Sequence, residues 1–400
     1  MTDIAEKYSS LPPEYQQVIL RAEEQHKITI KPLQELVGGW SGAIIYLVSA
    51  TEQGSNNIQH MVLKLDHSNE KSSSDETARH KSVLTKSPGA FAKAHIPDMV
   101  YESVRHENAM VIFYAIAGQS LHDFQTLSKY SQKNQLETLF SETNKTLLDV
   151  WNIDRKFEQF EHPKDLLQKW LGFRLNEGQK IEEFVKEECG IDPDSPGFII
   201  DGNIFPNPLY YARNINGWDQ ARPLDICIGF QHSDLNINNI LAKFDSAGEI
   251  LKGYFLIDFA LYKENMPLLY DHRYLEISYL VHTLEHGSFN KLIKFMVNIS
   301  KYGGDEQVPI EMIGVQAVMG TARQGFENWL EKKYPSLQDD LLGQYWLAGT
   351  AAGLSFAHKA GQTTEVRLAG LIYAAVNLKQ FFNIFKIPLP TEASHLFTAG

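Results

Sequence analysis

The chain has 400 residues, of which 43% are hydrophobic and 22% are charged. These ordinary values predict a packed globular core and exclude a chain that is disordered throughout. The formal net charge of -12 argues against nonspecific nucleic-acid binding, which favours basic surfaces.

The sequence carries no pattern for export or membrane insertion. No apolar run reaches the roughly 18 residues that a membrane span needs. The opening segment MTDIAEKYSS carries acids and lacks the apolar stretch of a signal peptide. Two cysteines, Cys189 and Cys227, are too few for a disulfide framework. We therefore expect a cytoplasmic protein with no membrane or nucleic-acid partner, and no pattern indicates its oligomeric state.

The first part of the chain is predicted to form a helix followed by a strand-rich region. Residues 9–14 (SSLPPE) read as a capped helix start with proline in the first turn, and the helix should run to about Lys27. A second helix is expected over residues 74–85. Apolar or β-branched runs between turn residues predict strands at 28–36, 43–50, 59–66, 101–105 and 110–116.

After Gly118 the pattern changes to long amphipathic helices, most clearly over residues 165–188, 344–360 and 366–385. One short β segment, residues 239–259, interrupts them. Residues 190–224 are rich in Pro, Gly and Asn, which predicts a loop-rich insertion. Its aromatic and polar side chains either line an acceptor pocket or pack as a surface loop.

These elements divide the chain into three parts. Residues 1–27 form an N-terminal helix, and residues 28–117 form a small β-rich lobe. Residues 118–400 form a large helical lobe, which includes the segment 230–260 and the insertion at 190–224.

The segment with the clearest chemistry is 230–241, which reads FQHSDLNINNIL. It has the pattern H-x-D-L-x-x-x-N, and the apolar strand YFLI that follows ends at Asp258. An Asp in such a loop can accept the proton of a substrate hydroxyl. Asn239 and Asp258 offer the hard oxygen ligands that Mg²⁺ prefers. An ordinary hairpin turn is the alternative, but the complete pattern with a second acid after the strand favours a kinase.

This segment resembles the catalytic loop of the aminoglycoside-phosphotransferase and choline-kinase superfamily, in which Asp-Leu-x-x-x-Asn is followed by Ile-Asp-Phe. The resemblance implies a bilobal, protein-kinase-like α+β fold with a small antiparallel β-sheet lobe and a large, mainly α-helical lobe. It implies that Asp234 is the catalytic base or orients the substrate, and that Asn239 and Asp258 bind the metal. It gives His232 a structural role beneath the loop.

A glycine-rich turn lies between two predicted strands of the small lobe. Gly38, Gly39 and Gly42 allow backbone N–H groups to approach phosphates closely, and Ser41 can reach a phosphate oxygen. The turn resembles the phosphate loop of the same superfamily. It is neither the G-x-G-x-x-G loop of protein kinases nor a Walker A motif.

A single lysine, Lys64, stands in the apolar strand that follows this turn. A lysine seldom points inward without a partner, and an outward-facing lysine on an alternating strand is the alternative. Its position matches the phosphate-binding lysine of kinases, which pairs with a helical glutamate. Glu76 is the predicted partner, and Glu70 is the second candidate.

Residues 111–121 resemble the hinge between the two lobes of this superfamily. The resemblance makes Phe113 the gatekeeper and gives the backbone of Tyr114 and Ile116 the hydrogen bonds to the purine. Tyr114 replaces the common Glu and Ala117 the common Pro, which leaves both ATP and GTP open as donors.

Two further patterns bear on the function. Asp271 either braces the catalytic loop, as an Asp of the superfamily often does, or has no such role. His282 begins an H-x-x-E-H match to zinc peptidases, for which no third ligand is evident, so a chance match is favoured. The stretch 258–271 lacks the Ala-Pro-Glu and the length of a regulated activation segment, which favours a small-molecule acceptor.

The sequence therefore predicts an Mg²⁺-dependent kinase that transfers the γ-phosphoryl group of ATP or GTP to a hydroxyl of a small molecule. One alternative is a protein-directed kinase of a bacterial signalling or host-interaction system. Another is a nucleotide-binding module without turnover. No motif identifies the acceptor.

Overall fold

The computed structural model describes residues 8, 11–36, 43–67, 76–119, 123–200, 202–219, 221–283, 289–299 and 312–395. The chain folds into two compact units. Unit 1 comprises Met1–Lys129 and Asn238–Tyr262, and unit 2 comprises Tyr130–Ile237 and Lys263–Gly400.

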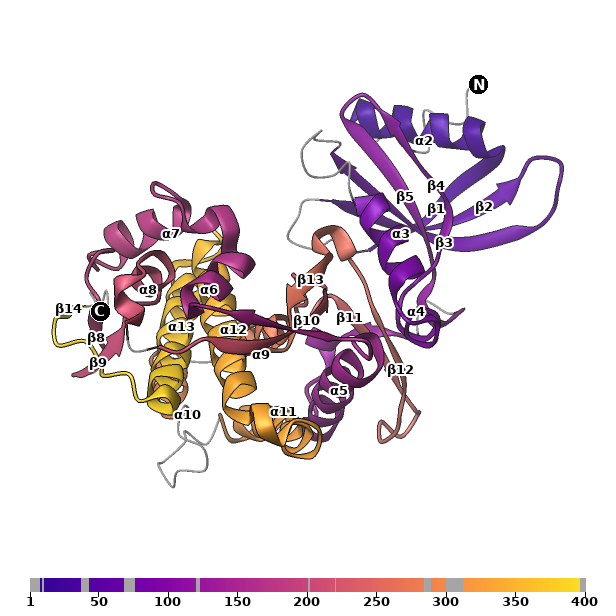
Figure 1. The fold of residues 1–400 in the computed structure, drawn as a ribbon. Helices are drawn as coiled ribbons and strands as arrows, with labels where there is room; N and C mark the ends of the chain where they lie inside the picture. Colours follow the sequence, from indigo (N-terminus) through magenta and orange to yellow (C-terminus); the bar gives the residue numbers. More distant parts are fainter. Residues whose placement is uncertain are drawn as a thin grey trace. The chain divides into compact units, whose positions relative to one another are not determined.

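Unit 1 is built on a five-stranded antiparallel sheet in the order β1-β2-β3-β5-β4. Helix α2 (Pro13–His26) covers one face of this sheet (Figure 1) and buries its apolar stripe there. The strands are β1 (Ile28–Leu36), β2 (Ile44–Glu52), β3 (Ile58–His67), β4 (Met99–His106) and β5 (Ala109–Ala115). The predicted helix and strands are confirmed, with small differences at their ends.

A second part of unit 1 comes from far along the sequence. The hairpin β11 (Ile240–Phe244) and β12 (Leu251–Leu256) is followed by the short helix η8 (Phe259–Leu261). Helix α3 (Glu76–Lys86) packs against η8, α4 (Gly89–His95) packs against β12, and β6 (Gln125–Thr126) pairs with β11. The predicted lobe 118–400 had included this hairpin. In the structure, these contacts place the hairpin in unit 1 together with the five-stranded sheet, and unit 1 also includes the residues up to Lys129.

Unit 2 contains a small sheet that the sequence analysis missed. Its strands β7 (Lys156–Phe160), β10 (Leu224–Gln231) and β13 (Lys263–Pro267) pair antiparallel in the order β13-β10-β7. The prediction of a single β segment after Gly118 was therefore wrong. Strand β7 (KFEQF) is almost fully exposed, and its two phenylalanines stand three positions apart, so it lacks the apolar alternation that marks a strand.

The predicted long helix over residues 165–188 was also wrong. The structure has α6 (Pro163–Leu171), the 3₁₀ turn η5 (Gly172–Leu175), α7 (Lys180–Glu183) and the π turn η6 (Phe184–Glu188). Gly172 has φ 55° and Gly178 has φ 70°, both in the left-handed region that a right-handed helix excludes. The two glycines therefore interrupt the segment that the apolar periodicity had predicted to be one continuous helix.

The insertion at 190–224 contains short elements packed on unit 2. They are β8 (Gly197–Ile200), β9 (Asn203–Pro206), α8 (Pro208–Arg213) and η7 (Asn216–Trp218), and β14 (Ser394–His395) pairs with β8. Tyr211 and Trp218 are buried, and the centroids of their rings lie 4.9 and 5.9 Å from that of the Phe382 ring. Of the two interpretations of these aromatic residues, the structure supports packing.

Long helices form the core of unit 2. They are α5 (Lys133–Thr146) with the π turn η4 (Leu147–Trp151), α9 (Tyr270–His282), α10 (Phe289–Ile299), α11 (Ile313–Lys333), α12 (Gln338–His358) and α13 (Thr364–Phe385), with η11 (Pro335–Leu337) before α12. The mainly helical character predicted for this part of the chain is confirmed, and with the sheet of unit 1 it gives the predicted α+β class.

Helices α12 and α13 run side by side (Figure 1) and approach each other through glycines. A Cβ on Gly353 would lie 2.4 Å from the carbonyl oxygen of Gly370, so no larger residue fits without a shift. Helix α13 is long and apolar enough to cross a membrane by length and composition, but 72% of its apolar window is buried inside the protein, as in a core helix.

A buried charge network ties α9, α11, α12 and α13 together. Glu276 accepts hydrogen bonds from Arg273 at 2.6 Å, from Arg323 at 2.6 Å and from the Tyr373 hydroxyl at 2.7 Å. Arg273 also donates to the Tyr345 hydroxyl at 2.7 Å. Removing one member would leave an uncompensated buried charge, so the network fixes how these helices pack.

Candidate active site

The predicted lysine–glutamate pair forms in unit 1. The Lys64 Nζ on β3 donates to both carboxylate oxygens of Glu76, at 2.8 and 3.0 Å, and Glu76 is the first residue of α3. Both side chains are buried, with 9% and 3% of their surfaces exposed. Burial opposes the charge on Lys64, but the carboxylates of Asp258 and Glu76 outweigh it and raise the pKa of Lys64. The lysine is therefore a fixed cation.

Asp258 meets the same lysine, since its Oδ1 lies 3.3 Å from Lys64 Nζ. Asp258 has φ 64°, a left-handed conformation that is uncommon for a residue with a side chain and that clusters at functional sites. Its side chain is about one-third exposed, at 33%. The Oδ1 atom of Asp258 therefore faces the lysine, while part of the Asp258 side chain is open to solvent.

The hairpin of β11 and β12 brings Asn239 close to this position. Ile240 pairs with Leu256, and the Ile257 N–H donates to the Asn239 carbonyl at 3.0 Å. Asn239 therefore stands opposite the residue that precedes Asp258. The register explains why two residues nineteen positions apart come close together: they flank the open end of one hairpin.

The donor types at this hairpin end fit Mg²⁺. An amide oxygen of Asn239 and a carboxylate of Asp258 are hard oxygen ligands, and Mg²⁺ in nucleotide sites is typically held by one or two such residues plus phosphates and water. Within the described ranges, no group of three or more His, Cys, Asp or Glu side chains is placed to hold a metal ion. The residues fit a metal shared with a nucleotide better than a metal held by protein alone.

Tyr114 has a role that the sequence analysis did not foresee. Its hydroxyl donates to Glu76 Oε1 at 2.9 Å, so it fixes the carboxylate that pairs with Lys64. Its backbone lies in the ladder between Val62 of β3 and Met99 of β4. Ile116 lies just beyond the end of β5. The purine contacts predicted for Tyr114 and Ile116 stay predictions. At Tyr114, a hydrogen bond to the purine would involve a backbone that already pairs with two strands of the sheet.

Several predicted positions lie outside the described residues. They are Gly38, Gly39, Ser41 and Gly42 of the glycine-rich turn, the alternative acid Glu70, and the second half of the H-x-x-E-H match.

In unit 2, the predicted catalytic residue Asp234 is held by a tyrosine. The Tyr274 hydroxyl of α9 donates to Asp234 Oδ1 at 2.6 Å. Burial and the negative charge of Asp234 raise the pKa of Tyr274 well above its usual value, so the hydroxyl stays protonated and donates. Charge-assisted bonds of this length are strong and directional. Tyr274 therefore sets the direction in which the Asp234 carboxylate points.

Asp271 braces the loop before Asp234, which is one of the two possibilities that the sequence left open for this residue. The two carboxylate oxygens of Asp271 accept from the backbone N–H groups of His232, at 2.7 Å, and Ser233, at 2.9 Å. Ser233 has φ 70°, so the loop turns through a strained residue one position before Asp234. Burial raises the pKa of Asp271 to about 6. His232 is fully buried, which agrees with a structural role.

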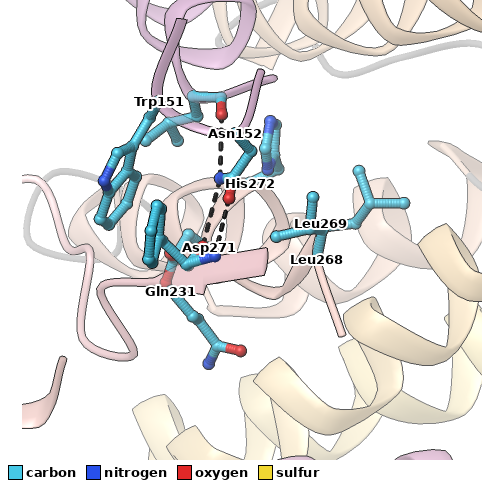
Figure 2. A pocket seen from close by; sticks show the side chains of 9 residues that line it. Trp151, Asn152, Gln231, Leu268, Leu269, Asp271 and His272 are labelled. Carbon is cyan, nitrogen blue, oxygen red and sulfur yellow. Dashed lines mark hydrogen bonds between the residues drawn. The ribbon is translucent and has the colours of Figure 1, made fainter. Parts of the chain in front are cut away.

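A small cavity lies behind this brace (Figure 2). It measures about 10 Å³, room for about one water molecule, and its lining includes Gln231, Asp271 and His272. The strand that leads into the loop is clamped there by Asn152, which accepts from the Phe230 N–H at 2.7 Å and donates to the Phe230 carbonyl at 3.2 Å. The loop is thus anchored from two directions.

Comparison with known proteins adds structural matches only. No protein-family model and no curated protein sequence matches the chain. An ethanolamine kinase of Plasmodium vivax matches with a TM-score of 0.40 and 12% identity, covering 92% of this chain and 84% of that chain. The spectinomycin phosphotransferase APH(9)-Ia, solved with ADP and spectinomycin, matches with a TM-score of 0.34 and 9% identity, covering 92% and 98%.

Both matched proteins fall in the choline-kinase and aminoglycoside-phosphotransferase superfamily that the motif resembles. Neither TM-score reaches 0.5. The fold class therefore rests on the chain's own strand order and helices, and its chemistry rests on its own residues.

Proposed function

We propose that this chain is a kinase that transfers the γ-phosphoryl group of ATP or GTP to a hydroxyl of a small molecule. The observation that carries the proposal is the meeting of Lys64, Glu76 and Asp258 in unit 1. They come from a strand, a helix and a hairpin end, and their ion pairs measure 2.8 and 3.3 Å. A buried cation held between two acids, one of them part-exposed beside an amide ligand, suits nucleotide phosphates and their metal.

Each residue has a defined task in the proposed reaction. Lys64, held by Glu76, binds phosphate oxygens, and Asn239 and Asp258 would hold Mg²⁺, which would neutralise phosphate charge when bound. Asp234 orients the acceptor hydroxyl and takes its proton. The hydroxyl oxygen forms a bond to the γ-phosphorus as the bond from that phosphorus to the bridging oxygen breaks, and the nucleoside diphosphate leaves. Most of the rate then comes from positioning and electrostatics.

Replacing Asp234 by alanine tests this assignment. Asp234→Ala removes the group that orients and deprotonates the hydroxyl, so turnover should fall by about three orders of magnitude or more, the range seen when a catalytic residue is lost. Nucleotide binding belongs to unit 1 and should be retained. Thermal shift with ATP, GTP and Mg²⁺ measures binding, and release of nucleoside diphosphate over a panel of hydroxyl compounds measures turnover.

Asp154→Ala is the matched control, because Asp154 is an exposed aspartate of unit 2. Turnover in Asp234→Ala equal to that of the control contradicts the proposal. Transfer to protein but to no small molecule would support the protein-directed alternative. Nucleotide binding without any transfer would support the non-catalytic module.

A further inference from the structure

One face of helix α3 is turned toward the segment 258–260 of unit 1, which begins with the proposed metal ligand Asp258. Helix α3 packs against the 3₁₀ turn η8, and η8 directly follows Asp258. Glu76, Arg79 and His80 stand three and four positions apart on α3. Residues at this spacing lie on the same face of a helix, so the three side chains can act on one neighbouring segment.

Two of the three act on side chains of the segment. Glu76 holds Lys64, whose Nζ lies 3.3 Å from Asp258 Oδ1. The ring of His80 meets that of Phe259 edge-on, with 5.7 Å between the ring centroids and 71° between the ring planes. Both of these rings are buried. The side chains of the first two residues of the segment are therefore tied to α3, one through a lysine and one through ring packing.

Arg79 acts on the backbone of the segment. Its Nη1 donates a hydrogen bond to the carbonyl oxygen of Ala260 in η8. The last carbonyls of a helix have no partner within that helix, and basic side chains commonly satisfy them. The preceding carbonyl, that of Phe259, accepts from the Tyr262 N–H at 3.0 Å. A hydrogen bond from a charged guanidinium is stronger than one between neutral groups, so Arg79 fastens η8 to α3.

The conformation of Asp258 requires such a hold. Its φ of 64° lies in the left-handed region, which is unfavourable for a residue with a side chain and persists only where the surrounding structure enforces it. Because η8 begins at the next residue, the position of the Ala260 carbonyl determines where the chain leaves Asp258. Without the bond from Arg79, η8 would be free to shift on α3, and Asp258 would relax toward an ordinary φ.

We propose that Arg79 is a positioning residue for the metal: its bond to the Ala260 carbonyl keeps Asp258 in the conformation in which its carboxylate is available to Mg²⁺. Arg79 is not itself a ligand, because a guanidinium offers donors and no acceptor. Groups that orient a metal ligand from behind typically contribute about 10- to 100-fold to metal affinity. The inference rests on the proposed function, in which Asp258 is a metal ligand.

Replacing Arg79 by methionine tests the inference through metal binding. Arg79→Met removes the donor and keeps an unbranched side chain. In the full-length protein, the binding of ADP and of GDP is measured by isothermal titration calorimetry, first without metal and then at increasing MgCl₂ concentrations. Nucleotide affinity without metal should stay unchanged. The Mg²⁺ concentration that gives half of the metal-dependent gain in affinity should rise by about tenfold or more, and saturating MgCl₂ should restore the affinity of the parent.

Two further variants separate positioning from folding. Arg79→Lys keeps a charged N–H donor on a flexible side chain, so it should recover part of the Mg²⁺ affinity that Arg79→Met loses. It carries the test alone if Arg79→Met does not fold, and it should then show a smaller shift in the same direction. Arg21→Met is the matched control, because Arg21 is an exposed arginine of α2 in the same unit. The control should leave the Mg²⁺ dependence unchanged.

Two results overturn the inference while the proposed function stands. One is a Mg²⁺ dependence in the Arg79 variants equal to that of the parent and of Arg21→Met. The other is an equal loss of nucleotide affinity with and without Mg²⁺, which would give Arg79 a role at the nucleotide or in the stability of unit 1 and none toward the metal ligand. A parent protein that binds neither nucleotide, or whose nucleotide affinity does not respond to Mg²⁺, instead contradicts the proposed function.

Discussion

The two units hold their charges in opposite ways. In unit 1, one buried cation lies between two carboxylates, Glu76 and Asp258. In unit 2, one carboxylate, Asp234, accepts a hydrogen bond from the Tyr274 hydroxyl and lies 3.5 Å from the ammonium group of Lys359. The first arrangement holds a cation in place between two acids, and the second holds one acid in place beside a hydroxyl and an ammonium group. The difference teaches that the fixed group is a cation in unit 1 and a carboxylate in unit 2, which matches the tasks that the proposed reaction gives to Lys64 and Asp234.

After Asp234→Ala, the largest effect is expected from the cation of unit 1. Lys64→Met removes the charge that both acids hold and leaves Glu76 and Asp258 buried or part-buried without it. We expect kcat/KM to fall by about 10²- to 10³-fold, the usual loss for one preorganised electrostatic group. Steady-state kinetics with varied nucleotide measures the loss, and thermal shift with Mg²⁺ and nucleotide reports binding.

Lys31→Met is the control for this change, because Lys31 is an exposed lysine on β1 of the same sheet. Lys64→Met with an unchanged thermal shift in nucleotide and unchanged activity would contradict the role given to the cation of unit 1. An effect on the KM of the acceptor alone would also contradict that role, since Lys64 would then serve the other half of the reaction.

The pair Lys64–Glu76 shows why unit 1 could be predicted from the sequence. A lysine in a strand and a glutamate at the start of the next helix lie only twelve residues apart, so local patterns fix both positions. The pairing of Asn239 with the end of β12 follows from one hairpin. The hydroxyl of Tyr114 was missed because nothing in a strand pattern shows that its side chain reaches Glu76 at the start of α3.

The second effect is expected from the brace in unit 2. Asp271→Asn keeps the size of the side chain but replaces one acceptor oxygen with an NH₂ group that faces a backbone N–H. The strained turn at Ser233 then loses one of its two holds, and Asp234 shifts. We expect kcat to fall by up to about 10²-fold, as small misplacements of a reacting group do. Nucleotide binding should stay unchanged, which thermal shift checks.

Asp154→Asn provides the matched control for that variant. Equal kcat in Asp271→Asn and the control would show that Asp271 does not position the loop. Loss of the nucleotide response in Asp271→Asn would show that the two halves of the reaction are not as separate as the units indicate.

Unit 2 was harder to predict because its contacts join distant parts of the chain. Lys359 and Asp234 are 125 residues apart, and Tyr274 is 40 residues from Asp234. No spacing rule marks such pairs, since tertiary packing decides them. The helix predicted over residues 165–188 failed for a related reason: its apolar periodicity continues across Gly172 and Gly178, whose positive φ angles end it.

The mildest effect expected concerns stability, and it compares one histidine from each unit. Burial lowers the pKa of His80 in unit 1 and of His272 in unit 2 from 6.5 to about 4. The unfolded chain binds these protons near pH 6.5 and the folded chain only near pH 4. The stability that each neutral histidine provides is therefore present above pH 6.5 and is lost as the pH falls toward 4. Between pH 7 and pH 5 each should cost about 2 kcal/mol of unfolding free energy.

Glutamine variants assign this pH dependence to a unit. His80→Gln can keep the hydrogen bond to the Pro97 carbonyl, and His272→Gln can keep that to the Asn144 carbonyl, but neither glutamine titrates in this range. Denaturant unfolding at pH 7 and pH 5 should show a smaller pH difference in each variant than in the parent. If the units unfold separately, each variant should flatten only the transition of its own unit, because a histidine stabilises only the structure that buries it. An unchanged pH difference in both variants would mean that neither histidine is held neutral by its unit.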